Sequence, residues 1–373
     1  MVSTIDTSPA RNESLLSETP YRSDTSPLSY GNESEVNQDL MTTSSIQLPD
    51  LFSSIMSIDP VVNPSYKKVK AEAEAWISMV FNLNEEQAQK NTEANFALMN
   101  AMWAPNAGDA ALRVMIDWHH WVFAFDDQFD EGPLNSDPVK AAEEIIYTLA
   151  LLDDVHPQVS PEENPLRHVF QSTWFRYREV TLQARYRNRI RKYCLGVLRQ
   201  VGVNYHSSAL SIEDYMNLRR HSIGTYPSFS LVEYAHGIEL TQEIIDHFSI
   251  RTCEEVASDL VILVNDLLSY RKDLEQGVRH NIIILLKDQG HTTQQAVDRV
   301  GHMLAAAYQR WYSALVELPT WGEKTDKEVL KYIDGCRNVA LGNLHWSYSS
   351  GRYLGDEGQQ VRRTQILNLP PEE

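Results

Sequence analysis

From Leu48 onward, most of the sequence consists of long segments with an apolar residue at every third or fourth position. Such spacing places the apolar side chains on one face of a helix. We expect helices over residues 66–83, 86–102, 109–125, 138–152, 165–203, 212–223, 227–234, 241–275, 292–312 and 326–350. No segment shows the sustained alternation that predicts a strand ladder. The chain is therefore predicted to be all-α.

Proline and glycine separate these segments, and no long polar linker interrupts the middle of the chain. The breakers are Pro105, Pro133, Pro157, Pro165, Gly224, Pro227, Gly237, Gly277 and Pro319. This punctuation is typical of a bundle of helices joined by loops. We predict a single helical domain over residues 47–365.

The two ends of the chain have a different character. Residues 1–46 are rich in Ser, Thr, Asn, Pro and acids, so ordering them would cost entropy with little burial in return. We predict a disordered Ser/Thr-rich acidic tail over 1–46 and a flexible C-terminal end over 366–373.

The formal net charge of −18 narrows the classes of partner. Nucleic acids and anionic membrane surfaces bind proteins through a basic surface, so we expect neither as a partner of this acidic chain. No apolar stretch is long enough for an integral membrane segment, and the N-terminus lacks a signal-peptide pattern. The three cysteines, Cys194, Cys253 and Cys336, lie too far apart to indicate a disulfide framework or a zinc cluster. We expect a cytoplasmic protein that is a monomer or a homodimer.

Four acidic residues follow an apolar stretch and precede a helix-stopping Gly-Pro pair: Asp126, Asp127, Asp130 and Glu131. Residues three or four positions apart share one side of a helix, so oxygens from successive turns can bridge divalent cations such as Mg²⁺. Carboxylates at a helix C-terminus oppose the helix dipole, and a bound cation would relieve that cost. The alternative interpretation is a solvated acidic helix end.

Three further oxygen ligands, Asn265, Ser269 and Asp273, follow one another at steps of four residues. On a helix they form one stripe. The stripe begins inside an apolar run, where an amide and a hydroxyl need a metal ion or a hydrogen-bond partner. The alternative is a core helix in which Asn265 and Ser269 bond to neighbouring groups and Asp273 pairs with Lys272 or Lys287.

The DDxxD pattern at 126–130 and the NDxxSxxxD pattern at 265–273 together resemble the paired metal motifs of class I terpene synthases, particularly the fungal sesquiterpene cyclases. The resemblance runs from Leu48 to Tyr353. The family usually has Glu where this chain has Asp273, which keeps the carboxylate. The resemblance implies a single-domain helical bundle that encloses a central active-site cavity. The metal ligands that it implies are Asp126, Asp130, Asn265, Ser269 and Asp273.

The resemblance also implies groups that bind the substrate diphosphate. The family carries an Arg before the second motif in a segment like RRxxxG, and we assign Arg220 as this diphosphate sensor. It lies four residues before Gly224, where the family's helix breaks and turns a backbone carbonyl toward the cavity. Further diphosphate-binding positions of the family are matched by Lys272, Arg352 and Tyr353. The alternative for Arg219 and Arg220 is an exposed basic pair, and for Lys272 a surface ion pair.

The activity that the resemblance implies is Mg²⁺-dependent ionisation of farnesyl diphosphate, followed by cyclisation of the carbocation to a sesquiterpene hydrocarbon or alcohol. Three Mg²⁺ ions are implied, with Mn²⁺ as an alternative. A carbocation needs apolar and aromatic walls that do not attack it. Phe123 and Trp346 are our candidates for these walls, and core packing is the alternative for each. We interpret His119 and His120 as structural.

Two other functions are compatible with the acidic motifs. A chain-elongating prenyl diphosphate synthase shares the helical fold and metal chemistry but typically carries two Asp-rich motifs, whereas Asn265 and Ser269 stand in the second motif here. A non-catalytic, divalent-cation-binding helical protein would leave Arg220, Arg352 and Tyr353 without a role.

Overall fold

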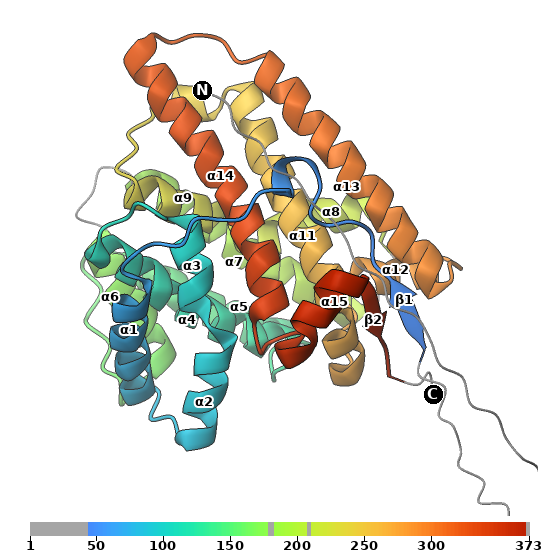
Figure 1. The fold of residues 1–373 in the computed structure, drawn as a ribbon. Coiled ribbons are helices and arrows are strands. Elements are labelled where there is room, and N and C mark those ends of the chain that lie inside the picture. Colours follow the sequence, from blue (N-terminus) through green and yellow to red (C-terminus); the bar gives the residue numbers. More distant parts are fainter. Residues whose placement is uncertain (1–43, 178–182, 207–209, 371–373) are drawn as a thin grey trace, which may run out of the picture. The chain divides into compact units, whose positions relative to one another are not determined.

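Helices form wherever the three- and four-residue spacing of apolar residues is sustained (Figure 1). The computed structural model describes residues 44–177, 183–206 and 210–370. The helices are α1 (Tyr66–Val80), α2 (Glu85–Ala94), α3 (Phe96–Trp103), α4 (Asp109–Asp130), α5 (Pro138–Ala150), α6 (Pro165–Tyr177), α7 (Gln183–His206), α8 (Ile212–Ser222), α9 (Thr225–Ala235), α10 (Gln242–Ile245), α11 (Phe248–Gln276), α12 (Ile282–Asp288), α13 (Thr293–Val316), α14 (Glu323–Ser349) and α15 (Gly358–Thr364). Single 3₁₀ turns lie at η1 (Ser54–Met56) and η2 (Gly355–Glu357). The prediction of an all-α fold is confirmed.

Two predicted helices are divided in the structure, and one short helix was not predicted. The segment 86–102 divides into α2 and α3 because Asn95 adopts the left-handed conformation, with φ of 51°. The segment 241–275 divides into α10 and α11, and the His247 side chain caps the start of α11. Helix α12 was not predicted, and the Asn281 side chain caps its first turn by accepting a hydrogen bond from the Ile283 amide. Short caps of this kind interrupt an apolar pattern without a proline or glycine.

Helix α11 is the central element of the bundle. It packs along α13 and α14, and also contacts α8, α9 and α12 (Figure 1). Helix α4 packs against α1, α3, α6 and α9. These contacts place the acidic end of α4 and the polar stripe of α11 within one bundle. Within the residues that the structure describes, none of the helices combines the length and apolar character needed to cross a bilayer.

The core is rich in fully buried aromatic side chains, among which Trp121, Phe125 and Tyr193 pack ring against ring. A buried ionic network also ties the helices together: the Arg189 guanidinium of α7 donates to Glu254 of α11, which also accepts from the Tyr332 hydroxyl of α14. Breaking one partner of such a buried pair is costly because the other charge is left uncompensated. The three cysteines are all free and buried, which agrees with the prediction that they form no disulfide framework.

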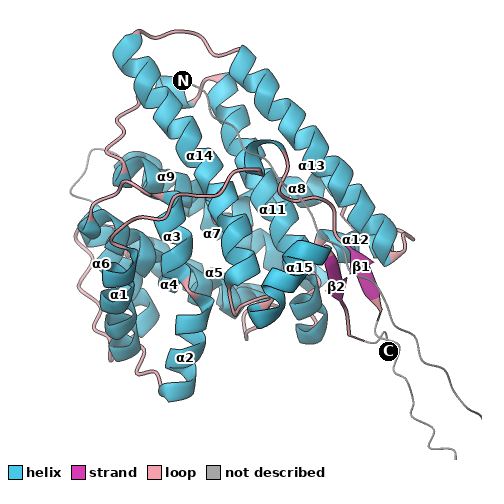
Figure 2. Ribbon diagram, viewed as in Figure 1, coloured by secondary structure: helices cyan, strands magenta, loops and turns pink. Residues whose placement is uncertain are grey.

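The bundle carries one short strand pair, shown in magenta in Figure 2. Strand β1 (Ser45–Gln47) pairs antiparallel with β2 (Ile366–Asn368), and Ile46 lies opposite Leu367. The side chains of Ile46, Leu367 and Leu369 are buried. The predicted domain limit of 47 is the last residue of β1, and the limit of 365 directly precedes β2. The flexible end predicted over 366–373 therefore includes a strand of the fold. Three-residue strands show no detectable alternation, and only the tertiary fold brings them together. The rest of the predicted tail, residues 1–43, and residues 371–373 lie outside the described residues.

The packing of α14 against α3 depends on Gly342, and this dependence can be tested. A Cβ atom at this position would lie 2.5 Å from Cδ1 of Trp103 and 3.1 Å from Cβ of Met102. We expect Gly342→Ala to lower the free energy of unfolding by about 1–3 kcal/mol because the buried indole must shift. Urea unfolding followed by circular dichroism measures this change.

The matched control is Gly202→Ala in α7, where a Cβ atom would meet nothing within 4 Å. This variant should gain about 0.5–1 kcal/mol, because alanine has less backbone entropy to lose than glycine. Equal effects of the two substitutions would contradict the packing argument.

Candidate active site

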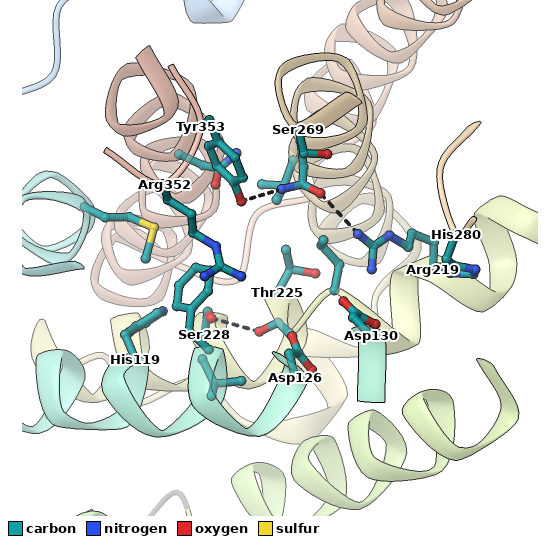
Figure 3. Close-up of a pocket in the computed structure, with 18 of the residues that line it drawn as sticks. His119, Asp126, Asp130, Arg219, Thr225, Ser228, Ser269, His280, Arg352 and Tyr353 are labelled. Carbon is teal, nitrogen blue, oxygen red and sulfur yellow. Dashed lines mark hydrogen bonds between the residues drawn. The ribbon is translucent and has the colours of Figure 1, made fainter. Parts of the chain in front are cut away.

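A cavity of about 900 Å³, counting the space at its open mouth, lies between α4 and α11 and is closed by α3, α8, α9 and α14. Figure 3 shows Asp126 and Asp130 on one wall, Ser269 on the facing wall and Arg352 with Tyr353 on a third. One part of the lining is therefore strongly polar, whereas the part around Phe123 and Val122 is apolar.

The acidic side chains at the end of α4 point in two different directions. Asp126 and Asp130 line the cavity and are held from behind by α7, where Tyr193 donates to Asp126 and Gln200 Nε2 donates to Asp130 over 2.6 Å. Burial raises the pKa of both carboxyls, and their mutual repulsion raises that of Asp126 further. Asp127 points elsewhere and accepts a 2.6 Å bond from the Arg352 guanidinium. The two predicted ligands thus lie together on the cavity.

The predicted stripe on α11 also faces the cavity. Asn265, Ser269 and Asp273 all line it. The Ser269 hydroxyl and the Asn281 amide both donate to Oδ2 of Asp273, over 2.6 and 2.9 Å. Burial raises the pKa of Asp273. Asp273 is therefore positioned by two neutral donors, and Lys272 pairs with Glu131.

The structure places Arg219, and not the predicted Arg220, at the cavity. The Arg219 Nη2 donates to Oδ1 of Asn265 over 3.1 Å (Figure 3). The Arg220 guanidinium instead forms two bonds to Asp259, of 2.6 and 3.0 Å, and a third to Asn217. Adjacent residues of a helix point about 100° apart, so only one of the pair can face the cavity. Of the two arginines, only Arg219 is therefore placed to contact a ligand in the cavity.

Spacing alone could not have made this choice. Arg219 lies four residues after the buried Tyr215, but Arg220 lies four residues after the buried Met216.

Gly224 ends α8 and begins α9, as predicted. Its φ of 78° is left-handed, a conformation that glycine adopts without a Cβ clash. Its carbonyl accepts a 2.8 Å bond from the Ser228 hydroxyl. Gly224, Thr225 and Ser228 line the cavity, so the break exposes polar groups there.

The other residues predicted to bind the diphosphate lie at the cavity, and the two basic ones are each paired with an acid. Arg352, Tyr353 and Lys272 all line it. The Arg352 guanidinium bonds to Asp127 and stacks over the Phe123 ring, 4.9 Å from its centroid. Lys272 pairs with Glu131. The Tyr353 hydroxyl accepts a 2.9 Å bond from Nδ2 of Asn265.

The two predicted aromatic residues take different places. Phe123 lines the cavity, whereas Trp346 lies behind it, with ring centroids 5.5 Å from those of both Phe123 and Tyr353. The Trp346 indole donates a 2.7 Å bond to the Ala94 carbonyl. Trp346 therefore supports two cavity residues and is not itself a wall of the cavity.

Three residues that position the site were not predicted: Tyr193, Gln200 and Asp266. Tyr193 and Gln200 stand seven residues apart on α7, a spacing that shares one helix face and could have paired them with the acids of α4. Asp266 accepts bonds from the Tyr215 hydroxyl, 2.6 Å away, and the Ile282 amide, 3.0 Å away, and lies 3.7 Å from Arg219. Burial raises the pKa of Asp266 to about 6.

The donor set of the cavity suits a hard divalent cation. Its ligands are carboxylate, amide and hydroxyl oxygens, and the buried carboxylates of Asp126 and Asp130 carry a repulsion that a cation would relieve. Among residues 44–177, 183–206 and 210–370, no group of three His, Cys, Asp or Glu side chains forms a metal centre by itself.

Comparison with known proteins identifies the family of the chain. The family model described as terpene synthase family 2, C-terminal metal binding, matches residues 117–310. Terpene cyclase 4 of Gibberella fujikuroi is 51% identical and aligns with 87% of this chain and 90% of its own length. The (+)-eremophilene synthase of the same organism is 43% identical, over 87% of this chain and 92% of its own length.

Solved structures agree on the fold. The crystal structure of α-eudesmol synthase superimposes with a TM-score of 0.69 at 20% identity, covering 79% of this chain and 98% of that one. The family model spans both the acidic end of α4 and the polar stripe of α11. This chain belongs to the terpene synthase family, and residues 117–310 form the part for which that family is described as metal binding.

Proposed function

We propose that this protein is a sesquiterpene cyclase that ionises farnesyl diphosphate with the help of Mg²⁺ and cyclises the resulting carbocation. The observation that carries the proposal is the shared cavity of α4 and α11, in which oxygen ligands from both helices face one space beside Arg219, Lys272 and Arg352. Negative charge develops on the departing diphosphate, and oriented cations stabilise it most strongly where water is excluded.

The polar part of the cavity suits the diphosphate. In the proposal, Asp126, Asp130, Asn265, Ser269 and Asp273 hold three Mg²⁺ ions. Bound Mg²⁺ would neutralise the phosphate oxygens and polarise the bond that breaks. Arg352 and Tyr353 donate to phosphate oxygens, and Arg352 exchanges its bond to Asp127 for a bidentate bond to phosphate. Arg219 already reaches a proposed ligand, Asn265, so it is placed to sense the diphosphate.

The apolar part of the cavity suits the hydrocarbon chain. Met99, Trp118, Val122 and Phe123 line it, and none of these side chains carries a nucleophile as strong as a carboxylate. The Phe123 ring already stacks under the Arg352 guanidinium, so its face is oriented toward positive charge. In the proposal, this face becomes free for the carbocation when Arg352 turns to the diphosphate.

The first experiment is incubation of the protein with farnesyl diphosphate and Mg²⁺, with volatile products analysed by gas chromatography and mass spectrometry. We expect a cyclic sesquiterpene and release of diphosphate. A chain-elongating synthase would give no product until isopentenyl diphosphate is added, and a cation-binding protein without catalytic activity would release no diphosphate from any allylic substrate.

The metal assignment is tested by Asp126→Ala and Asn265→Ala. Each removes an oxygen ligand from one wall of the cavity, so kcat should fall by at least about 10²–10³-fold. The helical circular dichroism spectrum should be unchanged, because both side chains face the cavity and not the packed core. Full activity in either variant would refute the assignment.

The choice between the two adjacent arginines is tested by Arg219→Ala and Arg220→Ala. Loss of Arg219 should lower kcat/KM by at least about 10²-fold, because a charge that faces the diphosphate is removed. Loss of Arg220 breaks a bond to Asp259 far from the reaction, so it should mainly lower the melting temperature. A larger loss of kcat/KM in Arg220→Ala than in Arg219→Ala would restore the original assignment.

A further inference from the structure

The break between α2 and α3 is bonded to a segment near the other end of the chain. A helix leaves its last carbonyls without partners of its own, and α2 ends at Ala94. The Ala94 carbonyl accepts a 2.7 Å bond from Nε1 of Trp346 and a 3.0 Å bond from the Ser350 hydroxyl. The Glu93 carbonyl accepts a 2.9 Å bond from the Gly351 amide. Two carbonyls of one helix end therefore hold the turn that follows α14.

The break itself is fixed by α1. Asn95 ends α2 with a left-handed φ of 51°, a conformation that asparagine tolerates better than most residues. Its Oδ1 accepts from the Tyr66 hydroxyl and from Nζ of Lys70, each over 3.0 Å. The Lys70 ammonium also donates to the Thr92 carbonyl over 3.2 Å. The two carbonyls that hold the turn after α14 thus belong to a well-supported element.

Ser350 connects this break to two residues of the cavity. Its side chain is fully buried, and its hydroxyl both donates to Ala94 and accepts a 3.1 Å bond from the Arg352 amide. The Ser350 carbonyl accepts from the amides of Tyr353 and Gly355, over 3.4 and 3.1 Å. The side chains of Arg352 and Tyr353 reach the cavity from this turn (Figure 3). One serine therefore ties the backbone of both residues to the end of α2.

The turn also packs closely against α2 at Gly351. A Cβ atom at this position would lie 2.9 Å from Cβ of Glu93 and 3.4 Å from its carbonyl oxygen. Only glycine lets the two backbones approach this closely without a shift. The contact between the turn and α2 thus combines hydrogen bonds with close packing.

We propose that Ser350 is a positioning residue for diphosphate binding, and that it acts by fixing Arg352 and Tyr353 to the break between α2 and α3. This inference rests on the proposed function, in which those two side chains bind the diphosphate. Side chains on an unsupported turn would have to be ordered at each binding event, and that ordering costs free energy. Affinity for the diphosphate should therefore depend on a hydroxyl whose bonds go to the protein backbone.

The test is the substitution Ser350→Ala, with two measurements. Calorimetric titration with inorganic pyrophosphate in the presence of Mg²⁺ gives a Kd, which should rise at least about fivefold because the Arg352 amide and the Ala94 carbonyl each lose a bond. Turnover of farnesyl diphosphate gives kcat/KM, which should fall about tenfold or more because the binding groups are misplaced. Gly351→Ala, which forces the turn away from α2 at a different atom, should change both measurements in the same direction. This second variant keeps the test decisive where the first does not fold.

A second background separates positioning from a general effect on stability. Ser350→Ala is introduced into the double variant Arg352→Ala, Tyr353→Phe. In this background it should change the pyrophosphate Kd by less than about twofold, because the groups that it positions are already absent. A serine that merely stabilised the fold would change the Kd by the same factor in both backgrounds.

The matched control is Ser349→Ala. Ser349 is exposed, and its hydroxyl donates to the carbonyls of His345 and Trp346 within its own helix, α14. Its substitution should leave the Kd and kcat/KM unchanged. An unchanged Kd in both Ser350→Ala and Gly351→Ala, or equal changes in the two backgrounds, would overturn the inference while turnover by the wild-type protein persists. Absence of both turnover and pyrophosphate binding in the wild-type protein would overturn the proposed function as well.

Discussion

Burial of two like-charged carboxylates, Asp126 and Asp130, is the constraint around which this molecule is organised. Their position at the C-terminal end of α4 opposes the helix dipole, and desolvation raises the pKa of both. Donors from α7 hold them in place from behind, and the Arg219 guanidinium lowers the cost of their charge across the cavity. In our proposal, bound cations relieve this unfavourable concentration of negative charge.

The same charges connect the walls of the cavity to one another. Asp127 holds Arg352 of the C-terminal segment, and Glu131 holds Lys272 of α11. Asn265 lies between Arg219 and Tyr353 and bonds to both. The ligand-free structure thus keeps its cationic groups next to acids that are not themselves proposed metal ligands. A diphosphate entering the cavity would meet donors that are already near their working positions, which reduces the reorganisation that binding requires.

The aromatic part of the cavity is built differently, by close packing. Trp346 supports Phe123 and Tyr353 from behind, and Gly342 allows α14 to approach the Trp103 indole. Rigid packing of this kind fixes the shape of an apolar space, which a carbocation needs if it is to close one ring and not another.

The sequence by itself determined the all-α class, most of the helices and both ligand stripes, because helical periodicity and four-residue spacing are local properties. It also located the paired motifs that mark the family. Only the tertiary structure decided that Arg219 and not Arg220 faces the cavity, that Trp346 lies behind it, that His119 lines it, and that β1 pairs with β2. Each of these depends on the rotation of a helix about its axis or on contact between distant segments. Helix rotation and long-range contacts are both set by the packing of the whole bundle, so they cannot be predicted from a short stretch of sequence.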